Sequence, residues 1–144
     1  MNNIFKKNIY VFLFLSPFSL FYPKFKKKSL IQKRKKTLEA EFKEAILVLA
    51  SLLSAGFSIE NAVKEAVVEL RLLYDKEVLI IKEFEYIQHR IYMKIPVEKA
   101  FEELGEKSHV EDIKNFARVL KLAKRSGGEL VSIINHTANI IHDK

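Results

Sequence analysis

Few residues in this chain can interrupt a helix or a strand, since there are four Gly and three Pro among 144 residues. Gly and Pro are the strongest local breakers of regular structure, so a chain with so few of them is built from long regular elements. Hydrophobic residues make up 49% of the chain and charged residues 30%, which is typical of a folded protein. No segment alternates apolar and polar residues between hairpin turns, so the expected fold class is all-α.

The apolar residues after Thr37 recur with the period of an α-helix. The first such stripe consists of Leu38, Phe42, Ala45, Ile46, Leu49, Leu52 and Leu53. The pattern continues to the end of the chain with interruptions near residues 55–58, 71–75, 94–96, 105–108 and 126–128. Short connections make neighbouring helices antiparallel, so we predict an antiparallel bundle of about six helices.

Local turn and capping residues support the first three interruptions. Gly56 is expected to end the first bundle helix, because glycine readily adopts the positive φ found after a helix C-terminus. Ser58 is the expected N-cap of the second helix, and Asp75 is that of the third. Pro96 is expected in the first turn of the fourth helix, where its missing N–H is not needed.

The later interruptions have signals of the same kind. Gly105 is expected to close the fourth helix. Ser108 and Glu111 have the spacing of a capping box, in which each side chain accepts a hydrogen bond from the backbone N–H of the other residue. This box predicts the start of the fifth helix, and Gly127 and Gly128 then break the chain before the sixth.

An uncharged apolar run, IYVFLFLSPFSLFY, occupies residues 9–22 ahead of the bundle. As a helix it spans roughly 21 Å, which is less than the ~30 Å hydrocarbon core of a bilayer. Tyr10 and Tyr22 lie at its ends, where interfacial aromatic residues belong, and a membrane helix tolerates the kink expected at Pro17. We predict a membrane-embedded helix. The alternatives are a cleaved signal peptide, for which a small-residue cleavage site is missing, and a core helix, which the flanking lysines suit poorly.

Positive charge is concentrated around this run. All ten basic residues before Thr37 lie in a stretch without acidic residues, whereas residues 37–144 carry 15 basic and 18 acidic residues. The positive-inside rule places residues 24–144 in the cytoplasm. We therefore expect a membrane segment with a basic linker over residues 1–36 and a cytoplasmic helical bundle over residues 37–144. The residues expected at the membrane surface are Lys24, Lys26, Lys27, Lys28, Lys33, Arg34, Lys35 and Lys36.

No constellation of residues predicts catalysis. The chain has no Cys, and His136 and His142 are too far apart to share a helical face as a metal-binding pair does. Gly127 and Gly128 lack the following Lys and Ser or Thr of a phosphate-binding loop. The basic tract adjoins an apolar run, so a membrane surface accounts for it better than nucleic acid does. We expect no catalytic residue, metal, cofactor or nucleic acid, and we interpret the bundle as a binding surface.

Three turns, taken in order, resemble those of a known family. The segment LVLASLLSAGFSIENAVKEA carries Gly56 followed by Ala62, KIPVEKAF carries Pro96 followed by Ala100, and SGGELVSII carries Gly127-Gly128. This order and spacing resembles the cytoplasmic domain of the type II secretion system F family. The single copy of the domain and the Gly-Gly turn are most similar to the tight-adherence pilus type. Family members continue into membrane helices after the bundle, whereas this sequence stops after the last predicted bundle helix, so we expect it to differ from the family in lacking those C-terminal helices.

The resemblance implies a non-enzymatic platform protein of the bacterial inner membrane. Such a protein couples an assembly ATPase to pilin subunits in a type IV or tight-adherence pilus or a type II secretion machine. Its implied partners are the membrane, that ATPase and other inner-membrane proteins of the machine, and a homo-oligomer is compatible with it. The alternatives are a membrane-anchored helical interaction module unrelated to secretion, a truncated and non-functional remnant of a platform protein, and a soluble helical enzyme or nucleic-acid protein.

Overall fold

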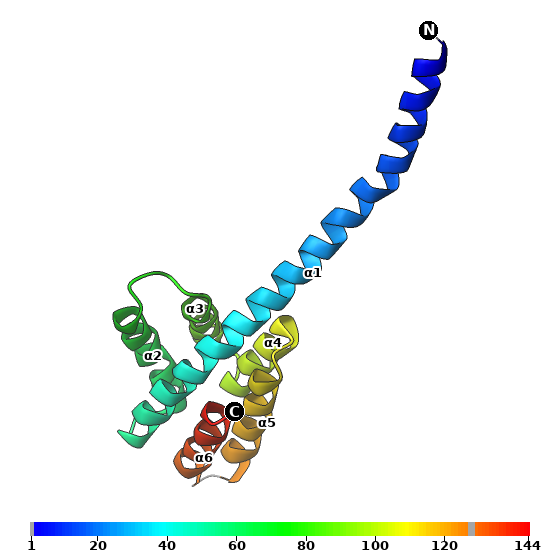
Figure 1. Ribbon diagram of the computed structural model, residues 1–144. Coiled ribbons are helices and arrows are strands. Elements are labelled where there is room, and N and C mark those ends of the chain that lie inside the picture. The colour runs from blue at the N-terminus through cyan, green and yellow to red at the C-terminus, as the bar shows by residue number, and fades with distance from the viewer. Residues whose placement is uncertain (1, 127–128) are drawn as a thin grey trace. The chain divides into compact units, whose positions relative to one another are not determined.

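The computed structural model describes the backbone of residues 2–126 and 129–144, and the side chains in these ranges except those of residues 2–5, 12, 15–28 and 126. The described residues form helices and no strand, which confirms the predicted all-α fold. In chain order the helices are α1 (Asn2–Ser54), α2 (Ile59–Leu73), α3 (Leu79–Tyr92), α4 (Val97–Ser108), α5 (Glu111–Ser126) and α6 (Leu130–His142), as Figure 1 shows.

The first helix, α1, covers both the apolar run and the first predicted bundle helix. The chain divides into two compact units, Met1–Arg34 and Lys35–Lys144, and α1 contributes to each of them. The division falls close to the boundary expected from the sequence, between residues 36 and 37.

The unit Met1–Arg34 consists of the N-terminal part of α1. Its described apolar side chains are exposed, and these are Ile9, Tyr10, Val11, Leu13, Phe14, Leu30 and Ile31. Among the described residues, no helix is both long enough and apolar enough to cross a bilayer. The membrane-embedded helix expected over residues 9–22 therefore stays a prediction.

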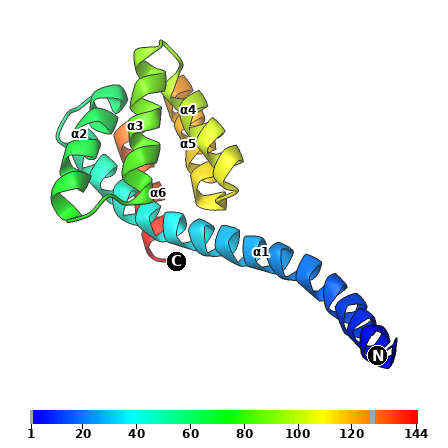
Figure 2. The same ribbon diagram turned by 90° about the horizontal axis from the view of Figure 1, so that it is seen from above.

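The helices of the unit Lys35–Lys144 alternate in direction, as two views at right angles show (Figures 1 and 2). α1, α3 and α5 finish at one end of this bundle, which we call the Gly56 end. α2 and α4 finish at the opposite end, which we call the Val110 end. The ion pairs of Lys124 agree with this arrangement, since its Nζ atom, in the last turn of α5, lies 3.0 Å from Glu98 at the start of α4 and 3.9 Å from Glu60 at the start of α2.

The core is built from the apolar stripes that the helical periodicity predicts. The whole first stripe, from Leu38 to Leu53, is buried. Phe42 of α1 and Phe116 of α5 have ring centroids 5.8 Å apart, and Phe101 of α4 lies 5.0 Å from Phe116. Phe84 of α3 is the fourth ring of this row, and its centroid lies 5.8 Å from that of Phe101. Edge-to-face aromatic pairs contribute about 0.5–1.5 kcal/mol beyond their buried area, so this chain of rings ties four helices together.

The fourth helix is longer than the sequence predicts. Gly105 was expected to close it, but α4 continues to Ser108, so that expectation is wrong. The helix ends instead at His109, which adopts a left-handed conformation with φ of 58° and donates its backbone N–H to the Gly105 carbonyl at 3.0 Å. Gly105 is buried inside the helix, where α4 approaches α5 closely.

The third helix begins later than predicted. Asp75 was expected to cap it, but α3 starts at Leu79, and its N-cap residue, Val78, has no side chain that accepts a hydrogen bond. The cap comes from another helix, because a carboxylate oxygen of Glu41 on α1 accepts from the backbone N–H of Ile80 at 2.8 Å. Glu41 accepts a hydrogen bond from a backbone N–H that has no partner within α3. Its negative charge also interacts favourably with the positive end of the helix dipole.

Candidate docking surface

The described residues form no cluster that could hold a metal ion. Within the ranges that the structure describes, no three His, Cys, Asp or Glu side chains lie close enough to hold a metal ion. The four histidines are separate and exposed, and they are His89, His109, His136 and His142.

The turn between α1 and α2 is built from strictly local interactions. Gly56 has φ of 102°, and its N–H donates to the Leu53 carbonyl at 3.1 Å. The N–H of Phe57 donates to the Leu52 carbonyl at 3.2 Å, which completes a Schellman motif. Ser58 is the N-cap of α2, and its hydroxyl oxygen accepts from the N–H of Asn61. These roles are the ones expected of Gly56 and Ser58.

The turn between α3 and α4 repeats the same motif without a glycine. Lys94 has φ of 67°, and its N–H donates to the Ile91 carbonyl at 2.9 Å. The N–H of Ile95 donates to the Arg90 carbonyl at 3.1 Å. Pro96 follows as the N-cap of α4, one position before the first turn in which it was expected. A lysine therefore occupies the left-handed position that glycine usually fills.

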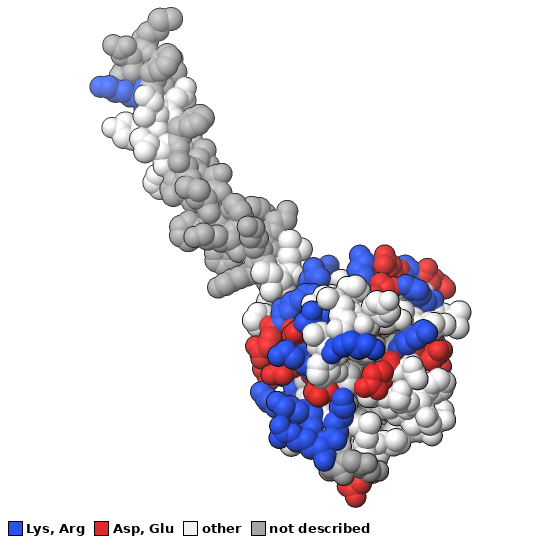
Figure 3. Space-filling view, turned by 180° about the vertical axis from the view of Figure 1, so that it is seen from behind, with Lys and Arg blue, Asp and Glu red and all other residues white. Residues whose placement is uncertain are grey.

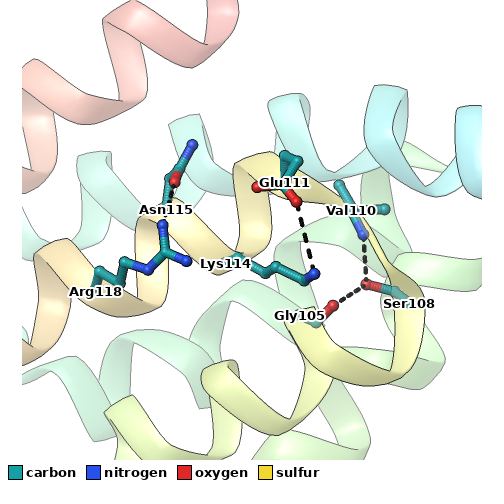
Figure 4. Close-up of polar contacts among 7 residues, drawn as sticks. All are labelled: Gly105, Ser108, Val110, Glu111, Lys114, Asn115 and Arg118. Atoms are coloured by element: carbon teal, nitrogen blue, oxygen red, sulfur yellow. Dashed lines mark hydrogen bonds and ion pairs between the residues drawn. The ribbon is translucent and has the colours of Figure 1, made fainter.

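The capping box expected at the start of α5 does not form, and this prediction is wrong. Ser108 is the last residue of α4, and its hydroxyl accepts from the N–H of Val110 at 3.3 Å (Figure 4). Glu111 points instead toward Lys114, with 3.6 Å between Oε1 and Nζ. In a capping box, Ser108 would be the N-cap residue just before α5. Here Ser108 belongs to α4, because α4 extends three residues beyond Gly105. The Gly127-Gly128 pair lies outside the described residues, and α6 begins after Glu129.

The predicted membrane-surface lysines are described only in part. The side chains of Lys24, Lys26, Lys27 and Lys28 lie outside the described residues. Of the others, Lys33, Arg34 and Lys36 are exposed, and Lys35 is half-buried. Exposure alone does not show whether these residues contact a membrane, so that contact stays a prediction.

Ion pairs hold the outer surfaces of α3 and α4 together. The guanidinium of Arg90 donates to both carboxylate oxygens of Glu103, at 3.1 and 2.8 Å. The Nζ atom of Lys107 lies 3.1 Å from the largely buried Glu83 and 5.1 Å from the centre of the Tyr86 ring. The charges of Arg90 and Lys107 are balanced by carboxylates of the bundle itself, so these two residues present little net positive charge to a partner.

The exposed side of α5 carries cations of a different kind. Arg118, Lys121, Leu122 and Arg125 are exposed and lie within two turns of one helix, and we call them the α5 basic face. The Arg118 guanidinium donates to Asn115 one turn earlier, at 3.1 Å. None of the three cations forms an ion pair with a described carboxylate. Figure 3 shows a continuous area of Lys and Arg at the end of the bundle where α5 finishes.

Next to this face, Lys124 has an acidic partner. Burial opposes ionisation of Glu98, but hydrogen bonds from its own backbone N–H and from Lys124, together with the charges of Lys124 and Lys121, lower the pKa of Glu98 below its ordinary value. Lys124 therefore forms its ion pairs with carboxylates of the bundle itself. Unlike Lys124, the three cations of the α5 basic face form no ion pair with a described carboxylate.

The sequence interpretation did not identify the α5 basic face. It noted Lys124 and Arg125 only as neighbours of a glycine pair. The signal was present, because the segment from Ile113 to Gly128 contains five basic residues and no acidic residue, although the bundle as a whole is mildly acidic.

No family model, curated protein or solved structure matches this chain.

Proposed function

We propose that this protein is a non-enzymatic platform subunit at a bacterial inner membrane. Its helical bundle would dock an assembly ATPase and pass the movement of that enzyme to pilin subunits of a type IV or tight-adherence pilus, or to their counterparts in a type II secretion machine. Residues 9–22 would attach the chain to the membrane, with residues 24–144 on the cytoplasmic side.

The observation that carries the proposal is α1. One helix includes the apolar run, the basic residues that follow it and the stripe that is buried from Leu38 onward. A membrane-attached segment and the first helix of the bundle would thereby be consecutive parts of the same helix. Two of the three turns that resemble the secretion family, those at Gly56 and Pro96, lie at the Gly56 end, where α1 and α3 finish (Figure 1).

The membrane half of the proposal is tested by expressing the full chain in a bacterium and washing isolated membranes with alkaline carbonate. We expect the protein to stay with the membrane. Leu13→Asp/Phe14→Asp should release it, because each charge inside a bilayer costs about 2.5–3.5 kcal/mol. The matched control is Leu72→Asp/Leu73→Asp, which alters two exposed apolar residues of α2 and should leave the protein membrane-bound. Release of the unaltered protein would contradict membrane attachment.

The platform half is tested by co-purification of the full chain with an assembly ATPase encoded beside its gene. Capture of that ATPase supports the platform. If neighbouring genes encode neither an ATPase nor pilins, or if the ATPase is not captured, a membrane-anchored interaction module unrelated to secretion is the better account.

A further inference from the structure

The α5 basic face presents three cations beside one exposed leucine. Arg118, Lys121 and Arg125 lie on the same side of α5, and Leu122, at the edge of that side, is 64% exposed. Residues 118 and 125 are separated by roughly 10 Å along the helix axis. A single exposed leucine is ordinary on a protein surface, so the feature that points to a partner is the group of three cations beside it, none of which forms an ion pair with a described carboxylate.

Nearby carboxylates balance only part of this charge. The groove between α4 and α5 is lined by Glu102 and Glu106 on one side and by Lys114, Arg118 and Lys121 on the other. Leu122 and Arg125 lie outside that groove. The positive charge therefore increases along α5 towards the Gly56 end, where Figure 3 shows the Lys and Arg side chains gathered.

We propose that the α5 basic face binds the anionic headgroups of a phospholipid bilayer, with Leu122 inserted at the interface. A basic face that carries an apolar side chain binds an anionic membrane surface through both charge attraction and apolar burial. This inference rests on the proposed membrane attachment and adds a second contact, made by the bundle itself.

An acidic protein surface is the main competing occupant. Protein interfaces are usually centred on a cluster of aromatic and apolar side chains surrounded by a polar rim. The α5 basic face has one apolar side chain and no aromatic residue among Arg118, Lys121, Leu122 and Arg125. This composition fits lipid headgroups better than a protein interface.

The experiment uses the full chain, which contains no Cys and so accepts a single labelled cysteine cleanly. An environment-sensitive fluorophore is attached at Leu122→Cys and, as a control, at Leu72→Cys, an exposed leucine in the last turn of α2, at the Val110 end. Each labelled protein is mixed with vesicles of phosphatidylcholine alone or of phosphatidylcholine with phosphatidylglycerol, and flotation of the vesicles is measured in parallel.

We expect the label at position 122 to shift to the blue on phosphatidylglycerol vesicles and not on phosphatidylcholine, and the label at position 72 to stay unchanged. Arg118→Gln/Lys121→Gln/Arg125→Gln should reduce the docked fraction by roughly fivefold for each charge removed. Lys64→Gln/Lys76→Gln/Lys82→Gln removes the same charge from other exposed positions and should keep the shift.

The outcomes separate this inference from the proposed function. Flotation without a blue shift at position 122 overturns the lipid contact of α5 and leaves membrane attachment standing. Failure to float with either vesicle overturns both. A shift that is equal on the two vesicle types, or that survives the removal of the three cations, also overturns the inference, as does a shift produced by polyglutamate but not by phosphatidylglycerol.

Discussion

A methyl group placed on Gly105 of α4 would lie 2.8 Å from Cγ and 3.1 Å from Cα of Lys114 on α5. Real Cβ atoms essentially never lie within 3.0 Å of another heavy atom, and a 3.1 Å contact is tighter than most, so Lys114 would have to shift. Gly105 is therefore the residue that lets α4 and α5 pack at this distance, and it does so from the middle of a helix.

Gly105→Ala should lower the free energy of unfolding by about 1–3 kcal/mol, because overpacking at a tight helix contact is only partly offset by the better helix propensity of alanine. Urea unfolding of the purified protein measures the change. Lys114→Ala removes the Cγ atom but leaves the backbone contact, so the double variant should recover part of the loss. Equal stability of Gly105→Ala and the unaltered protein would show that α5 can move away at no cost.

Lys94→Gly should stabilise the bundle by about 0.5–1 kcal/mol, because glycine adopts the left-handed conformation at this position without the steric penalty that lysine carries. Thermal unfolding detects the gain. Lys94→Ala is the matched control, since it removes the charge but keeps Cβ, and it should give no comparable gain. A gain of the same size with alanine would assign the effect to charge rather than to backbone strain.

Glu41→Ala should destabilise the start of α3 by about 1 kcal/mol, the typical cost of losing an N-terminal cap. The expected local sign is faster hydrogen exchange at the Ile80 amide, whose N–H donates to Glu41. Glu44→Ala removes another carboxylate from an exposed position of α1 and should leave that amide protected. Unchanged protection of Ile80 in Glu41→Ala would mean that another group replaces the cap.

Stability should depend on the ionisation of Glu98. Its pKa is lower in the folded chain than the ordinary value of 4.5, so its charged form stabilises the fold above pH 4.5 and this contribution is lost as the pH falls below that value. Urea unfolding of Glu98→Gln should therefore show a smaller loss of stability on acidification than the unaltered protein. Lys124→Gln should reduce the same dependence, and the double variant should add little to either change.

Much of the fold follows from patterns that lie within single segments. The helical period predicts the buried residues from Leu38 to Leu53, and the Gly56 and Ser58 turn depends on atoms at most five residues apart. Such features are predictable because the residues that determine them are neighbours in the sequence.

The features that the sequence did not predict depend on distant partners. The start of α3 is set by Glu41, which belongs to another helix, and no local pattern near residue 78 records it. Gly105 was interpreted as a helix end because glycine serves both at ends and at close contacts, and only the position of Lys114 distinguishes the two. The α5 basic face was overlooked because its significance depends on which cations are left unpaired after folding.

The attachment of α1 to the bundle has a mechanical consequence. Phe42 and Glu41 are successive residues of one helix, and they contact α5 and α3 respectively. Tension applied along α1 would load both contacts in shear at the same moment, instead of peeling them apart one after the other. The bundle would then yield abruptly at a threshold force rather than stretch gradually, which single-molecule pulling from the N-terminus of α1 would reveal as one sharp rupture.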